Sequence, residues 1–234
     1  YADCMSLYGD WANLALLERH LRELGNEVCI ERASFGETPD FAGADFLFLG
    51  AGTERTAQKV LVDFCRRRET ICSLANEGLP MLFSGTSFPF LGRNITDAGG
   101  AVTEGLALAD FTTVETTRRI TGDIYGGCPF LDAPVVGFLN KCSLISGIET
   151  PFLESASLGF GNETEHGPEG FHWKNVLATH ITGPLLVKNP ALLTLTLGAI
   201  YARRGLTLPE ELPRYPHEQD GYELTASELR RRFD

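Results

Sequence analysis

The stretch LPMLFSGTSFPFLG at residues 79–92 is where the sequence first suggests chemistry, because an apolar run breaks there at Ser84, Gly85 and Thr86. A buried strand, a sharp turn and a helix form the frame on which many α/β enzymes mount a nucleophile. The apex residue is Gly85, which has no side chain to attack a substrate. Glycine adopts strained turn dihedrals at the least cost, so we expect the turn to persist without a nucleophile.

A second glycine-rich turn, LGAGTE at residues 49–54, follows another apolar run. In an open α/β sheet both turns lie at the carboxyl ends of parallel strands, where ligands bind. Neither turn contains G-x-G-x-x-G or the Gly-Lys-Ser/Thr of a P-loop, so nucleotide binding has weak support. Backbone N–H groups around Gly50 and Gly52 are the expected oxyanion-binding side of such a site.

Composition and charge exclude several classes of function. The 234 residues carry a net charge of −11, which argues against nucleic acid and anionic membranes as main partners. No apolar run is long enough to span a bilayer, and no signal peptide pattern is present, so we expect a cytoplasmic protein. The six cysteines lack metal-binding spacing, so neither a metal nor a cofactor is expected.

The first half of the chain has the pattern of an α/β protein. Leucines at helical spacing predict a helix over 11–24, and an amphipathic pattern predicts another over 57–78. Strands are predicted at 27–33, at 45–52 and in the apolar run before Gly85, and a helix is predicted after the turn. This order fits a three-layer α/β/α sandwich with a central, mostly parallel sheet, whose first strand would lie before residue 1.

The second half differs from the first. Short strands predicted at 112–126, 133–140 and 154–162 form a β-rich excursion at about 110–165. Residues 176–186 are predicted as one more buried strand, and residues 189–205 as a helix that begins at Pro190. We expect residues 1–205 to form the domain, with 206–234 as a tail packed on it that contains a short helix at 226–233.

Several stretches, in order from residue 1 to about 205, resemble one family. YADCMSLYGDWAN at the start is similar to YPDLLNLYGDRGN of class I glutamine amidotransferase domains of the cobyric acid synthase (CobB/CobQ) type. FLFLGAGTE resembles LVFLGGGQD, VVGFLNKCS resembles LVGFENHGG, and LATHITGPLLVKNP resembles IGTYLHGPLLPKNP. The branch with the greatest resemblance is GatD, the glutaminase subunit of lipid II isoglutaminyl synthase.

The resemblance implies a function and a partner. Such a subunit hydrolyses glutamine and passes ammonia to an ATP-using, Mur-ligase-like synthetase, which amidates the D-glutamate of the lipid II stem peptide. The glutaminase uses a cysteine at the strand-to-helix elbow, and a histidine on a later strand activates it.

The same comparison places two departures at the chemical centre. The catalytic cysteine falls on Gly85 and the catalytic histidine on Thr182, while the residues that contact glutamine become Thr86, Ser87, Phe88 and Pro89. The resemblance therefore implies a degenerate subunit without glutaminase activity, because loss of either group costs several kcal/mol of transition-state stabilisation. The expected remnant of the binding frame comprises Gly50, Gly52, Thr86, Phe88 and Arg119.

Two alternatives remain open. An active amidotransferase with a rearranged site would use Ser84 or Ser87 with His180, which a continuous strand would place on the same face as Thr182. A stand-alone protein that binds an amino acid or a cell-wall peptide is the other alternative, with glutamine or a related molecule as its ligand. Tyr8 and Asp10 are expected to pack and cap the first helix, and Arg119 either forms a surface salt bridge or faces the partner.

Overall fold

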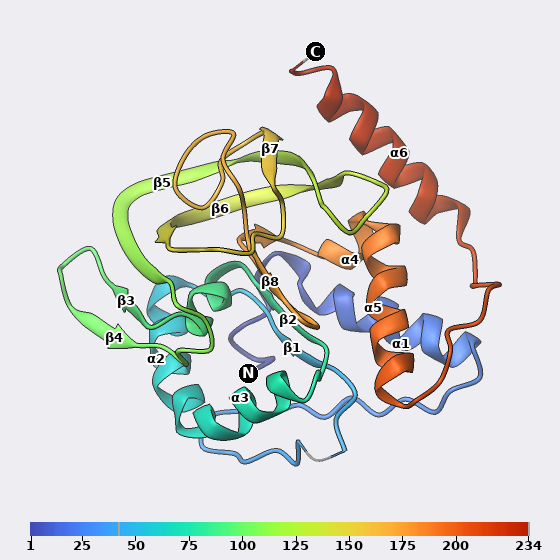
Figure 1. Cartoon of the computed structure of the whole chain (residues 1–234), viewed down its shortest axis with the longest axis horizontal. Coiled ribbons are helices and arrows are strands. Elements are labelled where there is room, and N and C mark those ends of the chain that lie inside the picture. The colour runs from blue at the N-terminus through green and yellow to red at the C-terminus, as the bar shows by residue number, and fades with distance from the viewer. Residues whose placement is uncertain (42, 234) are drawn as a thin grey trace.

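A mostly parallel four-stranded sheet lies at the centre of the computed structural model, which describes residues 1–41 and 43–233 (Figure 1). Its order is β1-β2-β9-β8, and β8 alone is antiparallel to its neighbour. The strands are β1 (Leu47–Leu49), β2 (Met81–Ser84), β8 (Phe171–Trp173) and β9 (Val176–Thr179). The predicted strand at 45–52 and the strand before Gly85 are confirmed.

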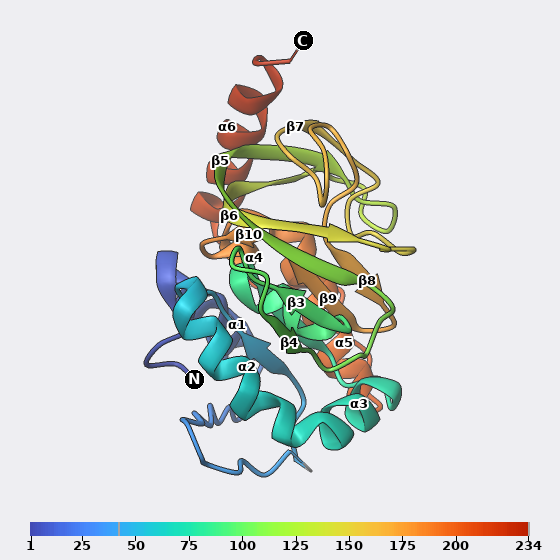
Figure 2. The same cartoon turned by 90° about the vertical axis from the view of Figure 1, so that its left-hand side faces the viewer.

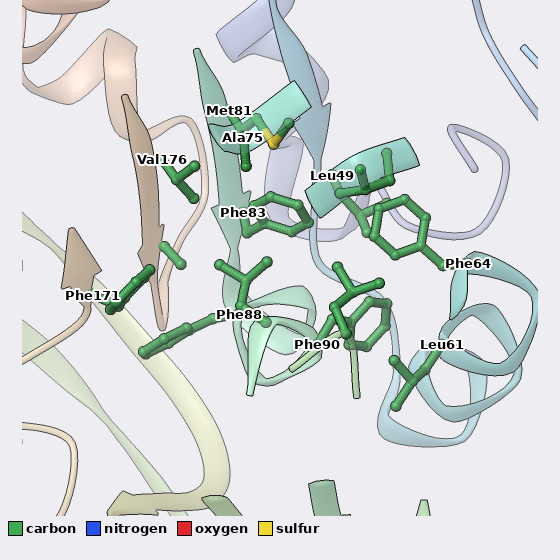
Figure 3. Packing of buried hydrophobic residues seen from close by; sticks show 14 of the residues in the cluster. Leu49, Leu61, Phe64, Ala75, Met81, Phe83, Phe88, Phe90, Phe171 and Val176 are labelled. Carbon is green, nitrogen blue, oxygen red and sulfur yellow. The ribbon is translucent and has the colours of Figure 1, made fainter. Parts of the chain in front are cut away.

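Helices cover both faces of this sheet and make the three predicted layers. Side chains alternate along β2, so Met81 and Phe83 enter the core on one face and Leu82 the core on the other. The first core is covered by α2 (Glu54–Phe64) and α3 (Arg68–Asn76), and its aromatic packing is shown in Figure 3. The second is covered by α1 (Trp11–Glu23), α4 (Leu185–Lys188) and α5 (Pro190–Arg203).

The predicted helix over 57–78 is two helices joined by the short 3₁₀ helix η2 (Cys65–Arg67). Thr53 caps α2, since its Oγ1 accepts a hydrogen bond from Thr56 N at 3.2 Å. At the other end of α2, Arg67 donates to both the carbonyl and the carboxylate of Asp63. The chain therefore bends where Arg67 turns back onto α2, a local side-chain contact that the apolar spacing does not reveal.

The β-rich excursion is confirmed, and it belongs to a second sheet of order β10-β6-β5-β3-β4, with β7 paired to β5. The two long strands form an antiparallel pair that is bulged between Glu115 and Ile120. The second view shows this sheet beside the central one (Figure 2). Its strands are β3 (Asn94–Thr96), β4 (Val102–Glu104), β5 (Thr112–Gly127), β6 (Val135–Ser146), β7 (Ser155–Leu158) and β10 (Ile181–Thr182).

The prediction of one continuous strand over 176–186 is wrong. The segment leaves the central sheet after Thr179, turns at His180 and joins the second sheet as β10. Thr179 Oγ1 accepts a hydrogen bond from Ile181 N at 3.0 Å, and this local bond replaces the next ladder contact. His180 therefore lies in the bend between the two sheets and shares no strand face with Thr182.

The predicted strand at 27–33 is also wrong, since residues 24–46 of the described chain contain no helix or strand. Their carbonyl groups bond elsewhere, as Arg22 donates to Val28 O and the amino group of Tyr1 donates to Ala33 O. Residues 28–34 instead form one wall of an apolar cavity of about 460 Å³ beside β1. In the described residues, β1 pairs on one side alone.

The C-terminal part follows the predicted outline with a longer helix. The predicted helix over 189–205 is α5 (Pro190–Arg203), and of the short helix expected at 226–233, residues 226–230 form the end of α6 (Pro216–Arg230). Tyr222 donates to Pro134 O at 2.8 Å, and Arg232 pairs with Asp123 of β5. No helix of the described chain has the length and apolar character needed to cross a membrane.

Candidate functional site

The turn after β2 has the geometry that its sequence predicts. Gly85 has a φ of +60°, in the left-handed region that favours glycine, and Ser84 before it is extended. The chain then enters the helix expected after the turn, which is the short 3₁₀ helix η3 (Gly85–Leu91). A sharp strand-to-helix turn is therefore present at the carboxyl end of a central strand, although its apex carries no side chain.

Three segments meet at this apex. A Cβ atom built on Gly85 would lie 2.7 Å from Ala51 Cβ and 3.1 Å from Thr182 Cγ2. The turn after β1, the turn after β2 and strand β10 thus bring together the two positions at which the resemblance places nucleophile and base. Ala51 was not among the predicted site residues. The signal for it was the single alanine inside Gly50-Ala51-Gly52, which aligns with three glycines in the family stretch.

The backbone N–H groups of the turn after β1 already have partners. Asp10 Oδ2 accepts from Ala51 N at 2.6 Å and from Ser84 Oγ at 3.0 Å, and Gly52 N donates to Thr86 Oγ1 at 2.9 Å. An oxyanion would have to displace these partners before it could bind there. Asp10 does not cap α1 with its side chain, contrary to expectation. Burial raises its pKa to about 6.

The hydroxyl groups of Ser84 and Ser87 are likewise engaged. Ser84 donates to Asp10, while Ser87 Oγ donates to Leu49 O at 2.7 Å and lies 3.0 Å from Ser84 O. Both side chains are fully buried. The structure brings neither serine into hydrogen-bond contact with His180 among its described contacts.

His180 instead meets Ser143, a residue that the sequence did not single out. His180 Nε2 lies 2.9 Å from Ser143 Oγ, and His180 Nδ1 lies 3.7 Å from Glu169 Oε1. Burial, together with the nearby Lys141 ammonium, lowers the pKa of His180 to about 4, against the opposing effect of the Glu169 carboxylate. Burial also lowers the pKa of Lys141, to about 8. At neutral pH, His180 is therefore an uncharged acceptor or donor within a buried polar cluster.

A small cavity separates this cluster from the turn at Gly85. It has a volume of about 20 Å³ and is lined by Gly85, Thr86, Lys141, Ser143 and His180, among others. That space holds about one water molecule. Cys142 also lines it, but burial and the carboxylates of Glu54 and Glu115 raise the pKa of its thiol to about 11, which keeps it protonated.

The remaining predicted binding residues lie in different environments. A Cβ on Gly50 would come within 2.5 Å of Met5 O, so this glycine permits close approach of the N-terminal segment. Phe88 is fully buried in the core, with its ring 5.6 Å from that of Phe111 and 4.9 Å from that of His180. A Cβ on Gly52 would collide with Met5 Sδ, so Gly52 also permits the N-terminal segment to pack closely.

Arg119 lies at the rim, where it joins β5 to two other elements. It forms an ion pair with Glu54 of α2 at 2.6 Å and donates to Asn140 Oδ1 of β6 at 2.9 Å. Asn140 in turn donates to the hydroxyl of Tyr8 at 2.8 Å. The salt bridge that was one of the two expectations for Arg119 is present. It is part of a hydrogen-bonded network that runs from Glu54 to Tyr8 at the edge of the site.

The fold and this elbow define an α/β protein of the glutamine amidotransferase type. A solved structure titled "Crystal structure of glutamine amidotransferase" superimposes with a TM-score of 0.54, covering 84% of this chain and 96% of its own at 16% identity. The chain belongs to the CobB/CobQ-like glutamine amidotransferase domain family, whose model matches residues 1–190.

Two relatives are similar over most of their length. Both are named lipid II isoglutaminyl synthase (glutamine-hydrolyzing) subunit GatD. The protein of Staphylococcus aureus strain N315 is 28% identical over 212 residues, covering 90% of this chain and 86% of its own. The protein of Streptococcus pneumoniae strain ATCC BAA-255 / R6 is 30% identical over 193 residues, covering 81% and 74% respectively.

Proposed function

We propose that this chain is a GatD-like subunit that does not hydrolyse glutamine and that works with a Mur-ligase-like synthetase in the cytoplasm. The synthetase would use ATP to activate the D-glutamate of the lipid II stem peptide and would take its ammonia from another source. The assignment to this pathway is supported by the similarity to GatD subunits from two organisms.

The loss of glutaminase chemistry is supported chiefly by the contact between Gly85, Ala51 and Thr182. A nucleophile needs a Cβ at position 85, and Ala51 Cβ stands 2.7 Å from where that atom would be. Thr182 has no ring nitrogen to take a proton, and its hydroxyl donates to Phe138 O at 3.1 Å. A cavity of about 20 Å³ is too small for glutamine.

Two measurements test the proposal. Purified chain incubated with glutamine should release no more ammonia than the same chain after heat denaturation. The chain should also co-purify with a Mur-ligase-like synthetase from its own organism. Ammonia release well above the heated control would refute the inactive assignment, and failure to bind any synthetase would favour a stand-alone binding protein.

One observation favours a second candidate, an acyl-transfer enzyme with Ser143 as nucleophile. Ser143 Oγ and His180 Nε2 are 2.9 Å apart, as a nucleophile and its base would be, although Glu169 Oε1 lies 3.7 Å from His180 Nδ1 and forms no hydrogen bond that would orient the ring. Their near-complete burial counts against it. A fluorophosphonate probe should leave Ser143 unmodified if the first proposal holds, whereas labelling that is lost in Ser143→Ala and in His180→Gln would support the second.

A further inference from the structure

Exposed apolar side chains surround the point at which Gly85, Ala51 and Thr182 meet. Leu7 is 37% exposed, Tyr8 48% and Phe138 37%. Leu7 N donates to Ala51 O at 2.9 Å, and Phe138 O accepts from Thr182. A Cβ on Gly183 would lie 3.4 Å from Tyr8 O. These residues come from the N-terminal segment and from β6, and together they border the closed site.

Tyr8 is held in an unfavourable backbone conformation while its side chain stays about half exposed. Its φ is +60° and its ψ +20°, the left-handed region that residues with a Cβ seldom adopt. Its hydroxyl accepts a hydrogen bond from Asn140, which fixes the ring against β6. Strain of this kind persists at functional sites more often than elsewhere, and here burial of the ring does not offset it.

Arg119 completes this rim through its contact with Asn140. Its side chain is 45% exposed although it bonds to both Glu54 and Asn140, so part of the side chain remains accessible to a partner. Aromatic residues and arginine are the types enriched at the centre of protein interfaces, because aromatic rings give a large contact area with few rotatable bonds and arginine offers a planar group with five N–H donors. The rim therefore has the composition of an interface in a chain whose relatives are named as subunits.

We propose that Tyr8, Phe138 and Arg119 are the centre of the surface that docks the synthetase subunit, an inference that rests on the proposed function. The partner surface would present an apolar patch to the two aromatic rings. A second copy of this chain is a poorer occupant, because two chains of net charge −11 repel one another. The closed site would then serve as a binding surface in place of a catalytic pocket.

The test compares a rim variant with a matched surface variant. Tyr8→Asn with Phe138→Thr removes both rings, and asparagine tolerates the left-handed backbone. Val62→Thr with Leu224→Gln is the control, since these side chains are 56% and 72% exposed on α2 and α6. Binding to the purified synthetase, measured by biolayer interferometry, should weaken about tenfold or more in the rim variant and less than about twofold in the control.

The outcomes distinguish failure of the proposed docking surface from failure of the proposed function. Wild-type chain that binds the synthetase, together with an equally tight rim variant, would overturn the docking surface and leave the proposed function standing. Wild-type chain that binds no synthetase would overturn both. Tyr8→Phe keeps the ring and should bind as wild type does. If sedimentation shows a dimer that the rim variant loses, the occupant is a second copy and the synthetase assignment fails.

Discussion

The Cβ position of Gly85 and the Cβ of Ala51 are 2.7 Å apart, closer than two carbon atoms can approach without movement. The turn after β2, with Gly85 at its apex, thus packs directly against Ala51 in the turn after β1, and this packing leaves no room for a side chain on Gly85. A side chain at position 85 must displace Ala51 and must also adopt a φ of +60°.

This contact predicts energetic coupling between the two positions. Gly85→Cys should destabilise the chain by about 2–4 kcal/mol, from left-handed strain and overpacking. In an Ala51→Gly background the same change should cost about 1–2 kcal/mol, because the left-handed strain and the 3.1 Å approach to Thr182 Cγ2 remain while the overlap with Ala51 Cβ is gone. Urea denaturation of the four proteins in a double-mutant cycle measures the coupling. Additive effects would contradict the contact.

The proximity of Thr182 predicts that a thiol introduced at position 85 can be activated. In Ala51→Gly/Gly85→Cys/Thr182→His, the imidazole should lower the thiol pKa, so that iodoacetamide alkylates position 85 at pH 6 about tenfold faster than in the variant that retains Thr182. Peptide mapping by mass spectrometry distinguishes this thiol from the six native cysteines. Equal rates would mean that the two positions do not face each other productively.

The sequence predicted the parts of the fold that local patterns control. Leucine spacing located α1, apolar runs located β1 and β2, and the Ser84-Gly85-Thr86 break located the elbow. Predictions failed where a distant or side-chain contact decides the backbone. The predicted strand over 176–186 stops at Thr179, because the Thr179 hydroxyl accepts a hydrogen bond from Ile181 N. The pattern of apolar residues in 176–186 gives no sign of that bond.

The candidate site was predictable to a similar degree. The family stretches brought out Gly85 and Thr182, and the structure places them together. Ser143 was missed because its partner His180 lies 37 residues away and the serine sits in an ordinary strand pattern. His180 was matched with Ser84 and Ser87 on the assumption of a straight strand. The crossing between sheets turns its ring toward β6 instead.

The buried position of Phe88 predicts a role in stability. Phe88→Ala should lower the free energy of unfolding by about 3–5 kcal/mol, because it removes a fully buried ring between Phe111 and His180. Phe88→Leu should cost less, since most of the volume remains. Leu224→Ala, at a position 72% exposed, is the control and should change stability by no more than about 0.5 kcal/mol. A Phe88→Ala protein as stable as wild type would place this ring outside the core.

The raised pKa of Asp10 predicts that its contribution to stability is lost as pH rises. Its carboxyl has a pKa of about 6 in the fold against an ordinary value of 3.8, so the native state keeps a proton that the unfolded chain releases between these values. Its contribution to the free energy of unfolding therefore falls across that window, by about 3 kcal/mol in total. Asp10→Asn should remove this falling component. Unfolding in urea at pH 4.5 and pH 7 measures this component. If the difference in stability between the two pH values is the same in Asp10→Asn as in the wild type, the raised pKa of Asp10 is contradicted.

His180 predicts the opposite slope over nearly the same range. Its pKa is about 4 in the fold against 6.5 ordinarily, so the unfolded chain binds a proton that the native state refuses. The contribution of His180 to stability is present above pH 6.5 and is lost as pH falls toward 4, again by about 3 kcal/mol. The two contributions oppose each other, and His180→Gln should leave a chain whose stability declines with rising pH through Asp10.

The matched control for that experiment is His217→Gln, on an exposed position of α6. It should keep the pH profile of the wild type. Combining Asp10→Asn with His180→Gln should remove both slopes, because the two side chains have no described hydrogen-bond partner in common. The prediction for His180 fails if His180→Gln has the same dependence of unfolding free energy on pH between 4.5 and 7 as the wild type. That result would show that the ring of His180 accepts a proton in the folded protein as it does in the unfolded chain.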